Sequence, residues 1–190
     1  MARLLHLTLA TLLLALLLPA TQGTPTPTPP PPPPPHHIPI AQRSAQELIA
    51  KLNLIPNIEK GYYIQTFQDT ATVPTSVGNR SASTAIYYLL EGAAGPSVWH
   101  RVDAVEVWHF YAGAPLTLTL SADDGRRPEV VTLGPDLFQG QRPQVPIPGW
   151  RWQSARSLGE WTLVGTTVAP GFLFSQSELA APGWKPSGVL

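Results

Sequence analysis

One segment restricts the fold of this chain more than any other, the run from Trp99 to Gly113, which reads WHRVDAVEVWHFYAG. Its polar and apolar residues alternate in the manner of β-strands. Side chains alternate between the two faces of a strand, so Glu106, Trp108 and Phe110 are expected on one face. The pattern predicts a β-sheet protein in which aromatic side chains and a carboxylate point into a shared interior.

A bend predicted at residues 103–104 brings a second group to the same interior. It allows His100 and Val102 of the preceding strand to face the side that carries Glu106. An imidazole and a carboxylate between aromatic walls are typical of a small-molecule site. The alternative is a buried His–Glu pair that only stabilises the fold. Because burying such a pair without a use is costly, we favour the site.

The rest of the domain is predicted to be one helix followed by strands and turns. Ser44 and Glu47 form a capping box, so we expect an amphipathic helix over residues 44–54 that Pro56 ends. Later runs rich in β-formers alternate with Gly, Pro and Asp turn signals. The predicted strands are 86–90, 105–111, 116–120, 130–133 and 161–168. Short, closely spaced strands after one helix predict an all-β antiparallel sandwich or jelly roll.

The first 40 residues are expected to direct and space the domain. Residues 4–18 form a leucine-rich run, which is shorter than the ~20 residues of a spanning helix. We therefore expect a signal peptide over 1–23 and a secreted protein with no membrane contact after cleavage. Residues 24–40 are a Thr/Pro-rich linker of the polyproline type. The domain is then expected over 41–185, with a short tail over 186–190.

Composition excludes several classes of function. The chain has 12 basic and 12 acidic residues and only 13% charged residues, so no basic patch for nucleic acid is expected. It has no cysteine, which excludes disulfides, thiolate metal sites and a cysteine nucleophile. The triplet Asn79-Arg80-Ser81 is an N-glycosylation acceptor, expected in a surface loop.

Residues in two parts of the sequence resemble motifs of a known protein family. The positions of His100, Val102, Glu106 and Gly113 resemble the first motif of the cupin superfamily, with Val102 in place of the second His. A second cupin motif resembles residues 148–153, where Gln153 occupies the His position.

Over a longer stretch, the sequence resembles the cupin-5 branch of RmlC-like proteins even more closely. The resemblance spans residues 44–179, and the shared segments are 83–90, 97–102, 106–113, 133–137, 143–144, 152–155, 163–165 and 168–172. It implies the cupin jelly roll (double-stranded β-helix) and a homodimer, while the activity of this branch is largely unassigned. Its members carry a His-Pro-Glu-Gly-Gly loop that reads Asn57-Ile-Glu-Lys-Gly61 here, and Gln65 replaces a later Glu. Glu59 in this loop is expected to be solvated.

The expected chemistry is acid/base catalysis without a cofactor. A first-row metal prefers several imidazoles, and one His, one Glu and one amide make a poor set, so a bound metal is the less favoured alternative. A His beside a Glu in an apolar pocket can act as a general base. His109 faces away, toward a dimer surface or a neighbouring strand.

Three functions stay open. The first is an isomerase or epimerase acting on a small, carbohydrate-like molecule; the second is a non-catalytic ligand-binding or storage-type cupin; the third is a metal-dependent oxygenase. The expected catalytic residues are His100 and Glu106. The expected substrate-binding residues are Trp108, Phe110, Gln153, Tyr88 and Tyr63.

Overall fold

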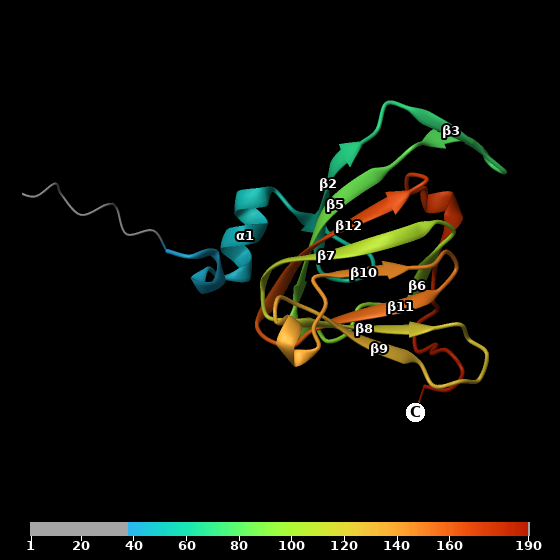
Figure 1. The fold of residues 1–190 in the computed structure, drawn as a ribbon. Coiled ribbons are helices and arrows are strands. Elements are labelled where there is room, and N and C mark those ends of the chain that lie inside the picture. Colours follow the sequence, from blue (N-terminus) through green and yellow to red (C-terminus); the bar gives the residue numbers. More distant parts are fainter. Residues whose placement is uncertain (1–37, 190) are drawn as a thin grey trace, which may run out of the picture. The chain divides into compact units, whose positions relative to one another are not determined.

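The computed structural model describes residues 38–189, which form two facing sheets (Figure 1). The six-stranded sheet has the order β1-β2-β5-β12-β7-β10 and the five-stranded sheet the order β13-β6-β11-β8-β9, with every pairing antiparallel. The predicted all-β jelly roll with one N-terminal helix is thus confirmed. The expected signal peptide and residues 24–37 of the expected linker lie outside the described residues. No helix within 38–189 is both long and apolar enough to cross a bilayer.

The elements follow one another along the chain. The strands of the six-stranded sheet are β1 (Ile55–Pro56), β2 (Tyr62–Gln68), β5 (Thr84–Glu91), β7 (Val105–Gly113), β10 (Gln144–Ile147) and β12 (Trp161–Ala169). Those of the five-stranded sheet are β6 (His100–Val102), β8 (Leu116–Ser121), β9 (Glu129–Leu133), β11 (Trp152–Ser157) and β13 (Ser177–Leu179). A separate ribbon pairs β3 (Thr72–Thr75) with β4 (Gly78–Ser81). The helices are α1 (Ala45–Leu52) and the 3₁₀ turns η1 (Ile40–Gln42), η2 (Gly92–Ala94), η3 (Leu137–Gln139) and η4 (Phe174–Gln176).

Helix α1 begins at the predicted capping box. The Ser44 side chain accepts a hydrogen bond from the Glu47 N–H, and the Glu47 carboxylate accepts one from the Ser44 N–H. The helix ends two residues earlier than expected, because Asn53 adopts the left-handed conformation and closes the last turn, so Pro56 has no part in ending it.

The six-stranded sheet is covered on both faces. Its inner face packs on the five-stranded sheet in a cluster that includes Tyr88, Trp108 and Val164. Its outer face carries a second cluster in which α1 packs against Leu89, Trp161 and Leu163. Side chains on both faces of strands β5 and β12 are therefore buried, as is typical of strands in parallel sheets.

The five predicted strands are all present, each within two residues of its expected ends. The strand predicted to carry His100 and Val102 is observed as β6, whereas the short strands β1, β3, β4, β10, β11 and β13 and the longer β2 were not predicted. Two edge strands of the sandwich carry proline, Pro56 on β1 and Pro146 on β10.

Candidate active site

A cavity of about 260 Å³ opens between the sheets, and strands β2, β5, β6, β7 and β12 provide most of its wall. Much of the lining is apolar, with five aromatic side chains: Tyr63, Tyr88, Trp108, Phe172 and Phe174. Three ionisable groups apart from the tyrosines reach it: Glu59, His100 and Glu106. The volume lies below the ~300–1,000 Å³ of pockets for drug-sized ligands, so the cavity fits a small molecule.

His100 is fixed in orientation by the backbone before its strand. It is 4% exposed, and its Nδ1 lies 2.9 Å from the Val98 carbonyl oxygen. A carbonyl only accepts hydrogen bonds, so Nδ1 carries the proton. The other nitrogen, Nε2, lies 3.4 Å from Glu59 Oε2 within the cavity. In the neutral ring Nε2 therefore keeps its lone pair on the cavity side, where it can take a proton.

Glu59 is the site residue that the sequence reading misjudged. It was expected in solvent, yet its side chain is only 20% exposed and lines the cavity. The loop folds inward because Asn57 Oδ1 accepts a hydrogen bond from the Glu59 N–H at 3.1 Å, while the Glu59 carbonyl oxygen accepts one from the Val98 N–H at 3.0 Å. Gly61 closes the loop at φ +70°, where a Cβ would lie 2.3 Å from the Leu89 carbonyl oxygen.

Burial makes Glu59 a weaker acid than usual. Desolvation raises the pKa of this carboxyl, the negative charge of Glu106 raises it further, and the neighbouring His100 acts in the opposite direction. Glu59 therefore holds its proton to higher pH than an exposed glutamate does. A carboxyl with a raised pKa beside an imidazole with a free lone pair is suited to proton transfer in both directions.

Glu106 is held by a chain of three side chains. Trp108 Nε1 can only donate, and it lies 3.0 Å from Gln153 Oε1. This contact turns the Gln153 amide so that Nε2 donates to Glu106 Oε2 at 2.6 Å. Gln153 is 1% exposed, so the chain is enclosed between the sheets. The carboxylate is thus fixed as a hydrogen-bond acceptor at the cavity wall.

The structure places the expected substrate-binding residues unequally. Tyr63, Tyr88 and Trp108 line the cavity. Phe110 is not among the lining residues: two residues beyond Trp108, it packs against the inner core cluster. Gln153 is also not part of the lining, because Glu106 and Trp108 occupy both ends of its amide.

Tyr88 supports the loop that carries Glu59. Its hydroxyl donates to the Lys60 carbonyl oxygen at 2.8 Å. Burial, with the charges of Glu59 and Glu106, raises the pKa of Tyr88 well above its usual range. The phenol stays protonated and serves as wall and support.

Two other predictions lie outside the cavity. His109 is hydrogen-bonded to neighbouring strands, through Thr167 on one ring nitrogen and Gln144 on the other, and burial lowers its pKa. Asn79 is exposed as expected, but it lies on strand β4 and not in a loop, because the ribbon continues through it.

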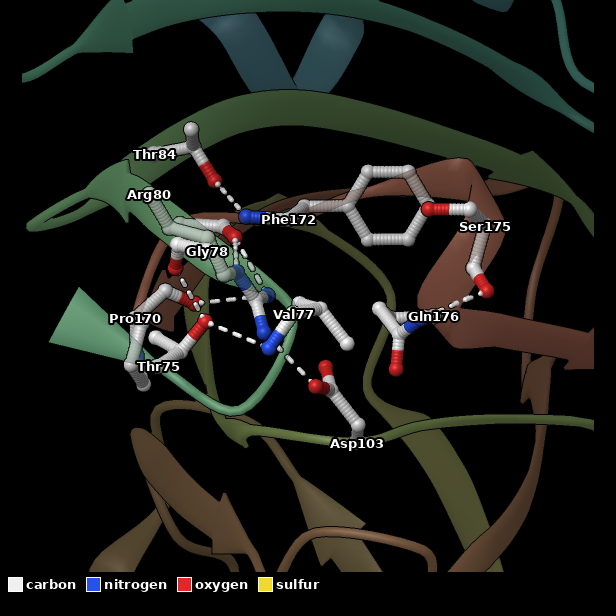
Figure 2. A network of polar contacts seen from close by, with 11 residues as sticks. Thr75, Val77, Gly78, Arg80, Thr84, Asp103, Pro170, Phe172, Ser175 and Gln176 are labelled. Carbon is white, nitrogen blue, oxygen red and sulfur yellow. Dashed lines mark hydrogen bonds and ion pairs between the residues drawn. The ribbon is translucent and has the colours of Figure 1, made fainter.

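The segment that carries Phe172 and Phe174 is held by a buried arginine (Figure 2). Arg80 is 4% exposed and pairs with Asp103 at 2.6 Å. Its guanidinium also donates to the carbonyl oxygens of Gly171 at 2.9 Å and Pro170 at 3.2 Å. The ribbon is thereby tied to the polypeptide that forms one side of the cavity.

The donor set suits a metal ion poorly. Among residues 38–189 there is no cluster of three or more His, Asp or Glu side chains arranged to hold one. Val102 lines the cavity beside His100 and brings no ligand atom. Gln153 is bound to Glu106 and Trp108. First-row metals favour several imidazoles, and this cavity has one among its described lining residues.

Comparisons with known proteins agree with the fold. A family model described as "Cupin superfamily (DUF985)" matches residues 46–180. A protein from Shewanella oneidensis is 32% identical with a TM-score of 0.67, and the match covers 74% of this chain and 86% of that one. A hypothetical protein from Leishmania major is 27% identical with a TM-score of 0.66, covering 72% and 86%.

Other solved structures are less similar to this chain. A dTDP sugar isomerase from Desulfovibrio desulfuricans is 17% identical with a TM-score of 0.44, and the match covers 67% of this chain and 95% of that one. No curated protein matches the chain.

Proposed function

The chain belongs to the DUF985 family of the cupin superfamily, and on this premise we propose that it is an acid/base isomerase acting on a small polar molecule. The observation that carries the proposal is the pair of Glu59 Oε2 and His100 Nε2, 3.4 Å apart on the wall of the cavity. One group is a buried carboxyl whose pKa is raised, and the other has a lone pair on the cavity side. This combination is what general acid/base catalysis requires.

In the proposed reaction His100 acts as the base and Glu59 as the acid. His100 Nε2 takes a proton from a carbon beside a carbonyl group, and the C–H bonding electrons move toward that carbonyl. Glu59 gives its proton to the carbonyl oxygen, which leaves an enediol. His100 Nε2 then gives its proton to the former carbonyl carbon, and Glu59 takes the proton of the hydroxyl on the carbon that was deprotonated, which becomes the new carbonyl. Both groups end as they began, and the isomerisation needs no oxidant or reductant.

The position of the pair favours isomerisation over epimerisation. An epimerase has to remove a proton from one face of a carbon and return it to the opposite face. Glu59 and His100 lie side by side and serve the same side of a ligand. Isomerisation moves a proton between neighbouring ligand atoms on one face, so it needs no second catalytic group on the opposite side of the cavity.

Deuterium exchange tests the proposal without knowledge of the product. The protein is incubated in D₂O with a panel of small hydroxyaldehydes and hydroxyketones, and deuterium incorporation at carbon is followed by NMR. His100→Ala should reduce the exchange rate by about 100-fold or more, the usual contribution of a positioned base. Glu59→Gln and Glu106→Gln should each reduce it by a similar factor.

His109→Ala is the matched control, since it removes an imidazole that lies on β7 outside the cavity lining. It should leave the exchange rate unchanged. No exchange with any member of the panel, or an equal loss in His109→Ala and His100→Ala, would overturn the proposal.

A specific observation favours a second candidate, a binding protein without turnover. Asn57 and Gln65 both line the cavity. They replace the His and the Glu that the cupin-5 branch carries at these positions. In that case His100→Ala, Glu106→Gln and Gln153→Ala would weaken ligand affinity to a similar degree, with no exchange to lose.

We also propose that the domain is secreted and pairs as a homodimer. The leucine-rich run over residues 4–18 supports export, and the family resemblance supports the dimer. Secretion of a full-length fusion into the medium and the sedimentation coefficient of the mature chain test the two points. Retention inside the cell, or a monomer at micromolar concentration, would contradict them.

A further inference from the structure

We propose that the cavity selects a ligand bearing a positively charged ammonium group and rejects anionic ligands. The proposal rests on the proposed function only in using the same cavity, because it concerns binding and not turnover. It is carried by the charge balance of the lining, by one carboxylate oxygen without a protein partner, and by the aromatic walls.

The described lining has two carboxyl groups and no Lys or Arg side chain to balance them. Glu59, His100 and Glu106 reach the cavity, while no Lys or Arg of the described residues lines it. The cations near by are engaged elsewhere: Lys60 Nζ donates to the Ala94 carbonyl oxygen at 3.0 Å, and Arg80 pairs with Asp103. Two carboxyl groups thus face one imidazole, and the negative charge of Glu106 has no basic side chain of its own to balance it.

Glu106 presents that charge to a ligand. It is 7% exposed, and its Oε2 accepts the hydrogen bond from Gln153. No hydrogen bond from residues 38–189 reaches its other oxygen, Oε1. In the same part of the chain no fully buried side-chain oxygen or nitrogen lacks a partner, so Oε1 is open to the cavity. A fixed carboxylate oxygen in a poorly solvated site is a strong acceptor for an N–H⁺ donor.

The walls suit a cation as well. Trp108 and Tyr88 pack at a ring-centroid distance of 5.8 Å beside the carboxylate, and both line the cavity. Aromatic faces attract ammonium groups, more strongly where water is excluded. An anion would instead face Glu106 in a medium of low dielectric constant, where like charges repel strongly. The expected ligand is therefore a small amine whose remaining surface is largely apolar or carries the carbonyl on which His100 would act.

Three probes that share a cyclohexane ring and differ in the polar group test the effect of ligand charge. Cyclohexylammonium, cyclohexanol and cyclohexanecarboxylate are titrated at pH 7, and binding is followed by calorimetry and by tryptophan fluorescence. The ammonium probe should bind at least tenfold more tightly than the alcohol, and the carboxylate should bind most weakly. Binding of the carboxylate as tight as that of the ammonium probe, or no measurable binding of the ammonium probe, would overturn the proposal.

Glu106→Gln tests the assigned residue with little change of shape. It should lower the affinity for the ammonium probe by at least tenfold and remove the preference over cyclohexanol. Glu160→Gln, the same substitution at an exposed position, should change neither. Thermal unfolding of both variants verifies that they are folded. If Glu106→Gln retains the preference, the proposal is wrong.

The two proposals fail separately. Ammonium selectivity without deuterium exchange would leave this inference standing and remove the isomerase. Exchange with neutral substrates alone, and no preference among the probes, would do the reverse.

Discussion

Glu59 shows how one residue on a short loop acquires a chemical role. Its neighbours along the chain are Ile58, 70% exposed, and the exposed Lys60, so only Glu59 of these three turns toward the sheets. The inward turn depends on Asn57 and Gly61, which fix the loop at both ends. Once inside, the carboxyl loses hydration and meets His100. Position in the fold, and not residue type, raises the pKa of this glutamate.

The raised pKa of Glu59 predicts a pH trend in stability. The folded protein binds this proton more tightly than the unfolded chain does. The stability that Glu59 contributes is therefore present at low pH and is lost as pH rises from the ordinary glutamate pKa, ~4.3, through the raised value. Glutamine has no proton to lose, so the midpoint of Glu59→Gln minus that of the wild type should become more positive over this window. Calorimetry from pH 4 to pH 8 measures it.

Glu47→Gln supplies a control of opposite sign. Hydrogen bonds from Ser44 and Arg43 lower the pKa of Glu47, so its contribution is present above the ordinary glutamate pKa and is lost as pH falls. The midpoint difference of this variant should become more negative as pH rises to the ordinary glutamate pKa, ~4.3, so its scans begin below pH 4. Parallel trends in the two variants would show that burial does not govern Glu59.

The sequence predicts Glu106 and Trp108 inside the fold because a strand has a period of two. The inward side of His100 follows from the bend at residues 103–104 in the same way. Periodicity does not say where along a strand the cavity ends, and Phe110, which follows Trp108 on the same expected face, is not among the lining residues. It also says nothing about loops. Glu59 meets His100 across 41 positions of sequence only because the sheets bring them together.

At the scale of elements, α1 covers the outer face of the six-stranded sheet. Leu48 packs in the outer cluster with Leu89 and Leu163, and Trp161 Nε1 donates to the Arg43 carbonyl oxygen at 2.9 Å. The start of the helix is therefore fixed both by its own cap and by the sheet beneath it. Most of the stability of so short a helix comes from such packing.

Ser44→Ala removes the cap while leaving the packing in place. We expect a loss of about 1 kcal/mol in the free energy of unfolding, the typical cost of an N-cap substitution by alanine. Urea denaturation measures it. Ser175→Ala, at an exposed serine within the η4 turn, should have no comparable effect. Equal losses in the two variants would show that the cap contributes nothing.

The β3–β4 ribbon depends on Arg80 for its connection to the main sheets. Arg80→Ala removes the partner of Asp103 and leaves two carbonyl oxygens without their donor. Breaking a buried ion pair on one side costs about 3 kcal/mol or more. The midpoint of urea denaturation should fall accordingly, whereas Arg156→Ala, at an exposed position on β11, should be nearly neutral. A loss below 1 kcal/mol in Arg80→Ala would contradict this account.

At the scale of the whole described domain, strands β5 and β12 hold the molecule together. Leu89 and Leu163 point to α1, while Tyr88 and Val164 point to the five-stranded sheet. The cavity wall therefore rests on strands that are packed on both faces. A wall of this kind can hold an acid and a base at a fixed separation, which proton transfer requires.

The prolines on the edge strands affect how the protein behaves when concentrated. Its formal net charge at pH 7 is zero, so charge repulsion between molecules is weak near this pH. The unpaired backbone groups of an open sheet edge can then form hydrogen bonds with another chain, which adds as a strand. Such pairing is the first step toward fibrils. Pro146 withholds one N–H donor from the exposed edge of β10. Pro146→Val restores it, and light scattering during storage at millimolar concentration should rise faster than for the wild type; equal rates would show that colloidal stability has another source.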